Sequence, residues 1–313
     1  MTVRLRWTDG NPAETGHRIY RDGAAIDPEA LPTPLADIGP DIEQYTDDTA
    51  VGGQTHHYRV SAYVGSVEKV GAELVVDANG PLDPVVGNVN FYYKMDTLVG
   101  GEVVDAAGKH NALIRNGATQ IAVGTGYAMQ FDGSNDYLAI RGLYRPADAT
   151  YPEFSGGCWF KTSSADRQVL TSFDRSEFYR LQVCYGDGTS YGDGTGLLGI
   201  SVTVDTGKVL DVGGITRVDD DQWHLAVFTY DHGALTLYLD GRIEEQATYG
   251  TTLGPSRAGV DRYGFVAVGS EANNEDGAKS TFWFKGAMTK VFEMERVMTE
   301  DEVVRMYRLG VDG

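Results

Sequence analysis

The sequence predicts an all-β protein of two sandwich domains that ends in one short helix. Forty glycines but only ten prolines occur in 313 residues, which indicates many tight turns. Short runs in which apolar and polar residues alternate recur along the chain, as in half-buried strands. One segment near residue 230 joins two such runs through a turn, and it is the most informative stretch of the sequence.

This stretch runs from Val218 to Gly241 and accounts for two strands and two turns. Its aromatic and β-branched part, Trp223 to Tyr230, is typical of a strand, and Ala234 to Leu239 predicts a second strand. The dipeptide Asp240-Gly241 indicates a turn with positive φ. Both faces of the first run are apolar, so we expect a central strand in one of two packed sheets.

The first 77 residues predict an Ig-like sandwich. Val3, Leu5 and Trp7 alternate with polar residues as in a half-buried strand, and further strand-like runs occur at 16–23 and 57–63. About seven short strands fit into this segment, which is the number that an Ig-like fold needs. We therefore place the first domain at 1–77. Residues 78–89, with two prolines and two glycines, predict a linker.

The motifs of this first domain resemble those of fibronectin type III domains. They are Leu5-x-Trp7, Gly16-x-x-Ile19-Tyr20-Arg21, Tyr45-Thr46-Asp47 and Tyr58-Arg59-Val60-Ser61-Ala62. His56 stands where the family often carries a tyrosine, so the tyrosine-corner hydrogen bond is in question while the fold is not. The resemblance implies a spacer or assembly module without chemistry of its own.

Residues 90–313 predict a second, larger sandwich. Six blocks follow one another in the order known from laminin G-like jelly rolls, which belong to the concanavalin A-like lectin/glucanase fold. They are Val103-x-Asp105-x-x-Gly108, Phe131-Asp132-Gly133-x-x-Asp136-Tyr137, Trp159-Phe160-Lys161, the Trp223-His224 hairpin, an apolar run from Phe265 to Gly269, and a terminal strand with a helix. The resemblance implies a concanavalin A-like jelly roll for this domain.

A short C-terminal helix is predicted by local signals. Thr299 to Glu302 forms a capping box of the Ser/Thr-x-x-Glu type. Val303, Met306 and Tyr307 then form an apolar stripe at helical spacing, and Gly310 is placed to end the helix. We expect this helix to pack on the sandwich.

Composition and charge argue against several classes of function. The formal net charge of −19 opposes contact with nucleic acid phosphates. The chain lacks an apolar run of membrane-spanning length, so we expect no membrane insertion.

Cys158 and Cys184 both lie in strand-like runs, and two buried free thiols are favoured over a disulfide. Two cysteines cannot form a four-ligand zinc site by themselves.

The laminin G-like resemblance also implies calcium as a possible cofactor, because many relatives bind it near the Val-x-Asp-x-x-Gly loop. Asp105 and Asn111 match the loop positions, and the carbonyl of Gly108 is a third candidate ligand. Thr289 stands where an aspartate is usual, and Lys290 follows it, which weakens a site that needs about six to eight oxygens. The alternative is that Asp105 is a turn residue that bonds to its own backbone.

A candidate glycan site lies in a Tyr-Gly-Asp-Gly-Thr sequence that occurs twice, six residues apart. Tyr185 and Tyr191 offer flat apolar faces with polar ends, and Asp187 and Asp193 can accept hydrogen bonds from sugar hydroxyls. The alternative is a glycine-rich turn or a contact to another subunit.

We predict no catalytic residues. Glucanases of this fold carry acidic residues at alternate strand positions, about 5 Å apart for a retaining mechanism. Glu293 and Glu295 are the nearest pair at such positions, and Asp219-Asp220-Asp221 is a turn in which the acids point in different directions. His224, next to Trp223, is expected to be a hydrogen-bonded strand histidine.

The N-terminal sequence MTVRLRWTDG enters a strand pattern without a charged and apolar leader. If this is the native start, we expect no export by the general secretory route. The two modules in this order then resemble structural proteins of tailed bacteriophages, where they decorate the capsid or form tail fibres and baseplate appendages.

This resemblance implies a non-enzymatic structural or adhesive protein located in the virion. Its partners would be other virion subunits or copies of itself in a homo-oligomer, and in addition a host surface glycan. One alternative is an extracellular bacterial adhesin module that binds carbohydrate. A second alternative is a glycan-active enzyme.

Overall fold

The computed structural model describes residues 3–8, 13–51, 54–77, 83–85, 87–146, 148–173, 178–183, 195–204, 207–254, 262–271 and 279–311. The chain divides into two compact units, Met1–Leu82 and Asp83–Gly313. The division falls inside the segment predicted as a linker, 78–89. Nearly all regular structure in both units is strand, in agreement with the predicted fold class.

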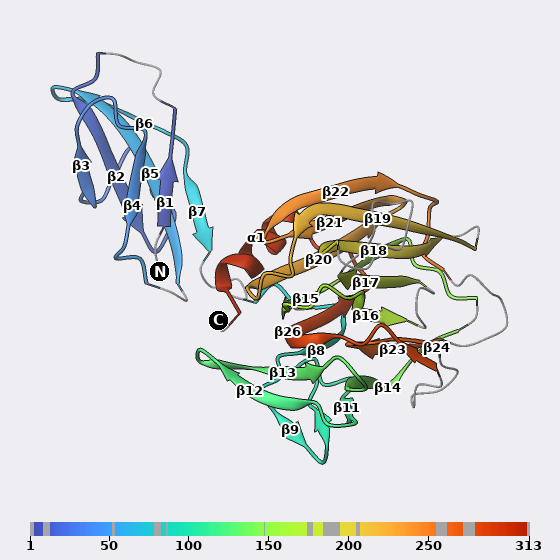
Figure 1. The fold of residues 1–313 in the computed structure, drawn as a ribbon. Coiled ribbons are helices and arrows are strands. Elements are labelled where there is room, and N and C mark those ends of the chain that lie inside the picture. The colour runs from blue at the N-terminus through green and yellow to red at the C-terminus, as the bar shows by residue number, and fades with distance from the viewer. Residues whose placement is uncertain are drawn as a thin grey trace. The chain divides into compact units, whose positions relative to one another are not determined.

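Unit 1 is a small antiparallel sandwich (Figure 1). One sheet pairs β1 (Val3–Arg6) with β4 (Gln44–Asp47). The other has the order β3 (Ala36–Ile38), β2 (Gly16–Asp22), β5 (Thr55–Val64) and β6 (Val67–Val70), and β7 (Leu74–Asp77) pairs with the first residues of β5. The core contains Val3, Leu5, Ile19, Ala50 and Tyr58. This Ig-like arrangement agrees with the predicted sandwich, and membership of the fibronectin type III family stays a prediction.

His56 makes the kind of hydrogen bond that the sequence left in question. It lies on β5, two residues before Tyr58, and its Nε2 is 2.9 Å from the carbonyl oxygen of Val51. A tyrosine corner likewise bonds to the backbone a few residues upstream. The imidazole therefore ties the entry of β5 to the preceding loop in place of a phenol.

A buried carboxylate, that of Asp47, joins the two sheets of unit 1. Its Oδ2 accepts hydrogen bonds from Arg21 at 2.7 Å and from Tyr58 at 2.8 Å, and its Oδ1 accepts from the hydroxyl and the amide of Thr49. Burial alone would raise the pKa of Asp47, but the bonds from Thr49, Tyr58 and Arg21 outweigh it and lower the pKa to about 2. Asp47 is thus held as an anion.

Unit 2 is a larger sandwich of two antiparallel sheets (Figure 1). The nine-stranded sheet has the order β19 (Lys208–Arg217), β18 (Leu197–Val204), β17 (Tyr179–Val183), β16 (Gln168–Phe173), β23 (Arg262–Val266), β14 (Tyr137–Arg145), β11 (Ala112–Arg115), β10 (Glu102–Val103) and β9 (Leu98–Val99). The eight-stranded sheet has the order β12 (Thr119–Val123), β13 (Gly126–Asp132), β26 (Lys285–Met294), β15 (Glu153–Lys161), β20 (Trp223–Asp231), β21 (Ala234–Leu239) and β22 (Arg242–Thr248), and β8 (Val89–Tyr93) pairs with β26. A small separate pair consists of β24 (Gly269–Glu271) and β25 (Lys279–Thr281).

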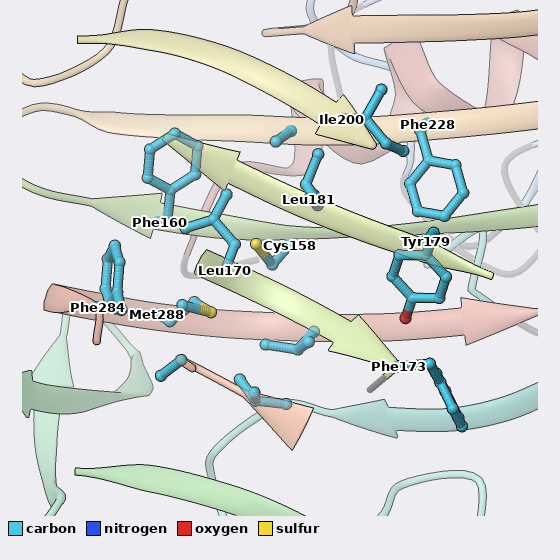
Figure 2. Close-up of a cluster of buried hydrophobic side chains, with 14 of the residues drawn as sticks. Cys158, Phe160, Leu170, Phe173, Tyr179, Leu181, Ile200, Phe228, Phe284 and Met288 are labelled. Carbon is cyan, nitrogen blue, oxygen red and sulfur yellow. The ribbon is translucent and has the colours of Figure 1, made fainter. Parts of the chain in front are cut away.

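The main core of unit 2 lies between these two sheets (Figure 2). Cys158 and Phe228 of the eight-stranded sheet face Leu181 and Tyr179 of the nine-stranded sheet in this cluster. Cys158 is a buried free thiol, as predicted, and burial raises its pKa. Cys184 lies outside the described residues.

The predicted central hairpin is confirmed. Strand β20 lies between β15 and β21, and Ala226 and Phe228 enter the core between the sheets. Leu225 belongs to a second cluster on the other face. Asp240 has a φ of 51° and Gly241 a φ of 77°, which are the positive values that the turn dipeptide predicts. Both faces of β20 are therefore buried, as the sequence indicates.

The C-terminal helix α1 (Glu300–Leu309) covers this second cluster. Thr299 and Glu302 form the predicted capping box, and Gly310 is the C-cap. Val303 and Met306 are buried against the outer face of the eight-stranded sheet. No helix in the described residues is long and apolar enough to cross a bilayer.

A buried ion pair connects the two sheets through the core. Arg145 on β14 donates to Glu293 on β26, and their side chains are 1% and 0% exposed. Glu293 also accepts hydrogen bonds from Tyr179 and Asn90, each at 2.8 Å. Burial raises the pKa of Glu293, while Arg145, Asn90 and Tyr179 act to lower it. The pair pins one strand of each sheet at a fixed register.

Candidate functional site

The loop between β10 and β11 is built around the carboxylate of Asp105, which is 2% exposed. Its Oδ1 accepts hydrogen bonds from the amides of Tyr92 at 2.7 Å and Ala107 at 2.9 Å. Its Oδ2 accepts from the amides of Lys109 and His110, both at 2.9 Å. An ionised carboxylate offers about four lone-pair positions, so these four donors saturate it.

The other two residues predicted for this site lie beside Asp105. The side-chain oxygen of Asn111 accepts from the Asp105 amide at 3.1 Å, and its Nδ2 donates to Glu102 at 3.1 Å. Gly108 has a φ of 71°, and its amide donates to the Asp105 carbonyl at 2.9 Å. Together with Glu102 and Arg141, which form an ion pair at 3.2 Å, these residues line one shallow polar depression.

In this arrangement the loop does not fit a calcium ion. The oxygens of Asp105 are already taken by backbone donors, and calcium needs about six to eight oxygen ligands. Thr289, at the usual aspartate position, donates its hydroxyl hydrogen to the carbonyl of Lys94 at 3.0 Å. Lys290 donates to the carbonyl of Gly310 at 2.7 Å. The hydrogen bonds are those of the alternative interpretation, in which Asp105 holds its own loop.

His224 lies between two carboxylates. Its Nδ1 is 2.8 Å from Asp240 and its Nε2 is 3.1 Å from Asp220. Burial lowers the pKa of His224, but the hydrogen bonds and charges of Asp240 and Asp220 outweigh it, so the pKa is raised above the ordinary 6.5. Asp240 also accepts the amide of Leu225 at 2.8 Å. The imidazole therefore fastens the β20–β21 turn, in line with the hydrogen-bonded strand histidine that the sequence predicts.

The predicted glycan residues Tyr185, Asp187, Tyr191 and Asp193 lie outside the described residues. Their role stays a prediction. The nearest described elements are β17 and β18, which pair with each other across this segment from Tyr179 to Val202.

A group of aromatic side chains gathers on the outer face of the nine-stranded sheet, and sequence reasoning missed it. We call it the aromatic patch. It consists of Tyr137, Tyr144, Tyr263, Phe265 and Trp283. The rings of Tyr137 and Trp283 lie 5.8 Å apart, and those of Tyr137 and Phe265 lie 6.1 Å apart. Helix α1 covers the outer face of the other sheet, so this patch has no helical cover in the described part of the chain.

The exposed end of the patch is a cross-strand tyrosine pair. Tyr144 on β14 is directly opposite Tyr263 on β23, and their ring centroids are 6.2 Å apart. Arg145, the next residue, points into the core toward Glu293, so Tyr144 points outward by the alternation of a strand. Tyr144 is 53% exposed. The pair therefore presents aromatic surface at the edge of a buried apolar cluster.

Comparison with known proteins identifies the family. A family model named Laminin_G_3, described as the concanavalin A-like lectin/glucanases superfamily, matches residues 131–304. The chain belongs to this superfamily. The match covers more than half of the chain and contains β14, β15, β20, β21 and β26 of the sandwich. No curated protein matches the chain.

The chain is also similar to solved structures at low sequence identity. The receptor-binding domain of botulinum neurotoxin C/D mosaic serotype aligns with a TM-score of 0.50 at 10% identity, over 71% of this chain and 51% of that one. Domain 4 of AbnA, an extracellular arabinanase from Geobacillus stearothermophilus, in complex with arabinotriose, aligns at 0.49 and 14% identity, over 70% and 98%. The chain thus spans about half the length of the neurotoxin domain, and at this identity the first match shows the fold alone.

The superfamily to which the chain belongs is named for lectins and glucanases, and the carboxylate pair nearest to a glucanase arrangement is Glu293 and Glu295. Glu293 is fully buried and neutralised by Arg145. Glu295 is 44% exposed but also lies 3.3 Å from Arg145. A retaining or inverting mechanism requires both carboxyl groups to reach the glycosidic bond, and Glu293 cannot do so from the core. This pair is therefore structural.

Proposed function

We propose that this chain is a non-enzymatic carbohydrate-binding protein that contacts its glycan through the aromatic patch. The observation that supports the proposal is the outward-facing pair of Tyr144 and Tyr263 on a sheet of a lectin-type sandwich. Tyr263 packs against the buried cluster that contains Tyr137 and Phe265, and Tyr144 packs against Tyr263. A rigid scaffold that carries a few exposed aromatic groups is a suitable binding surface.

The chemistry of the pair suits a sugar. A tyrosine ring offers a flat apolar face for the C–H groups of a pyranose, and its hydroxyl can donate to or accept from a sugar hydroxyl. The ring centroids of Tyr144 and Tyr263 are 6.2 Å apart, and the ring planes are tilted by 33° to each other. The two rings together therefore form one continuous aromatic surface. The buried Arg145–Glu293 pair holds β14 in place directly beneath Tyr144.

Glycan arrays provide the test. We expect binding by the wild-type protein and a loss of about tenfold or more, or about 1.4 kcal/mol, in Tyr144→Ala and in Tyr263→Ala. Tyr127→Ala is the matched control, because Tyr127 is 42% exposed but lies on β13 of the other sheet. Equal glycan binding by all three variants would refute the proposal that the aromatic patch binds glycan. Loss of binding only in Tyr185→Ala and Tyr191→Ala would move the site to the repeat predicted from the sequence.

We also propose that the protein is a virion component of a tailed bacteriophage, which uses unit 1 as a spacer or assembly module. The support is the order of an Ig-like sandwich followed by a lectin-type sandwich. Mass spectrometry of purified particles tests this, and light scattering tests for the symmetric oligomer expected of such parts. Absence of the protein from every particle would favour the alternative, an extracellular bacterial adhesin. Hydrolysis of a β-glucan by the wild-type protein would favour the second alternative, an enzyme.

A further inference from the structure

Unit 1 contains a groove beside β1, one of the two strands of its smaller sheet. The groove has a volume of about 520 Å³ and is lined by residues of β1, β2, β5 and β6 and of the segment 71–74. None of its lining residues belongs to β4, although β4 is the strand that pairs with β1. The groove therefore lies along the edge of β1 that is not paired with β4. Its lining includes the apolar side chains of Tyr58, Val60 and Leu74.

The open edge of β1 presents unpaired backbone groups to this groove. The amide of Trp7 donates to the carbonyl of Glu43, on the β4 side, at 3.1 Å. Because hydrogen-bonding directions alternate along an antiparallel strand, the amide and carbonyl groups of Arg4 and Arg6 point to the opposite edge. Among the described residues, no strand pairs with that edge. An edge of this kind is a template for an additional strand.

Two buried polar atoms in the groove also lack partners. His17 is 2% exposed, and its Nδ1 has no hydrogen-bond partner, nor has the indole Nε1 of Trp7. Both residues line the groove, and their rings lie 5.4 Å apart. Leaving such an atom unsatisfied costs about 1–3 kcal/mol, so this side of unit 1 is not fully satisfied in its polar groups.

The rim of the groove is basic although the chain as a whole is strongly acidic. Arg6 and Lys69 line the groove and are exposed, and neither has an ion-pair partner in the described part of the chain. We propose that this groove binds an extended strand of another protein, in which apolar side chains alternate with acidic ones. The strand would pair antiparallel to β1, place its apolar side chains against the apolar lining of the groove, and set its carboxylates beside Arg6 and Lys69. This interaction is independent of glycan binding by unit 2.

The test uses the full-length protein and three synthetic nine-residue peptides. One alternates valine with glutamate, and the second alternates valine with lysine. The third is the first with prolines at two glutamate positions, because the residues opposite Arg4 and Arg6 are the ones whose amides would bond to β1. Amide hydrogen exchange of residues 3–8 is the readout. We expect the acidic peptide to slow this exchange at least tenfold at millimolar concentration, the lysine peptide to slow it less, and the proline peptide to leave it unchanged, because proline cannot supply the strand hydrogen bonds.

The double variant Arg6→Glu/Lys69→Glu provides the matched charge reversal. We expect it to prefer the lysine peptide over the acidic one. Unchanged exchange with the acidic peptide, or an equal effect of the proline peptide, overturns the strand-binding proposal. An unaltered preference in the double variant overturns its charge component. If residues 3–8 are protected without peptide and light scattering shows a dimer, the occupant of the groove is a second copy of this chain, and the proposal of another protein is overturned.

Discussion

Asp47 should be one of the residues on which unit 1 most depends at neutral pH. Asp47→Asn keeps the size of the side chain but removes the charge that Arg21 and the hydroxyl of Tyr58 compensate. The native pKa of Asp47 is lowered from 3.8 to about 2. At 1.36 kcal/mol per unit, this difference corresponds to about 2.4 kcal/mol of folding stability at pH 7.

The pH dependence of this loss has a definite sign. A carboxyl group whose folded pKa is lowered stabilises the protein above its unfolded pKa, and this stabilisation disappears as the pH falls through the folded pKa. With values of 3.8 and about 2, the contribution of Asp47 falls from about 2.4 kcal/mol at pH 7 to about 1.3 at pH 3 and about 0.4 at pH 2. The difference between the wild type and Asp47→Asn should narrow accordingly.

Native-state hydrogen exchange of the β5 segment, 55–64, measures this difference within unit 1 of the intact chain. The matched control is Asp48→Asn, because Asp48 is the neighbouring residue and is exposed. We expect the control to change the free energy of opening by less than about 0.5 kcal/mol. A difference for Asp47→Asn that stays constant from pH 7 to pH 3, or that matches the control, would refute the role given to the buried carboxylate.

Three further changes test unit 2. His224→Ala should destabilise unit 2 most below pH 6.5, because the charged imidazole is what the two aspartates stabilise. The loss of stability should shrink as the pH rises through the raised folded pKa of His224. Calorimetry at pH 5.5 and pH 9 measures this loss, and a loss that grows with pH would contradict the reasoning. Asp105→Asn should lower the free energy of unfolding by about 2–4 kcal/mol, since at least two backbone donors lose their acceptor. A chelator should leave the melting temperature of the wild type unchanged. A melting temperature that depends on the chelator would instead support a bound calcium ion. Arg145→Ala should lower the free energy of unfolding, measured in urea, by about 3–5 kcal/mol, because it leaves the buried charge of Glu293 unpaired. The double variant Arg145→Met/Glu293→Met should lose clearly less, because it leaves no buried charge unpaired. Equal losses in the two variants would contradict this reasoning.

The parts of the fold that the sequence predicted correctly are those with local signals. The β20–β21 hairpin follows from a period of two residues and a turn dipeptide, Asp240-Gly241. Helix α1 follows from a capping box of four residues, an apolar stripe and a terminal glycine. In each case the residues that determine the structure lie within one or two turns of the chain, so their spacing alone carries the information.

The candidate sites depended on contacts that the spacing cannot reveal. The saturation of Asp105 needs the amide of Tyr92, which comes from β8, thirteen residues earlier. Glu293 looked like half of an alternating acidic pair, but its partner Arg145 is 148 residues away. Tyr144 meets Tyr263 only because β14 and β23 are neighbours, with an irregular register between Ala139 and Tyr144. Strand order and register decide these features, and neither can be read from a single segment.

We propose that glycan is bound at the outer face of the nine-stranded sheet. Carbene footprinting of the full-length protein, with and without a glycan selected on the array, tests it most directly. We predict protection of the segments 137–145 and 262–268, which carry Tyr144 and Tyr263, and no change at 126–132, which carries the exposed control residue Tyr127. Protection confined to other segments, or none in the presence of a bound glycan, would contradict the claim.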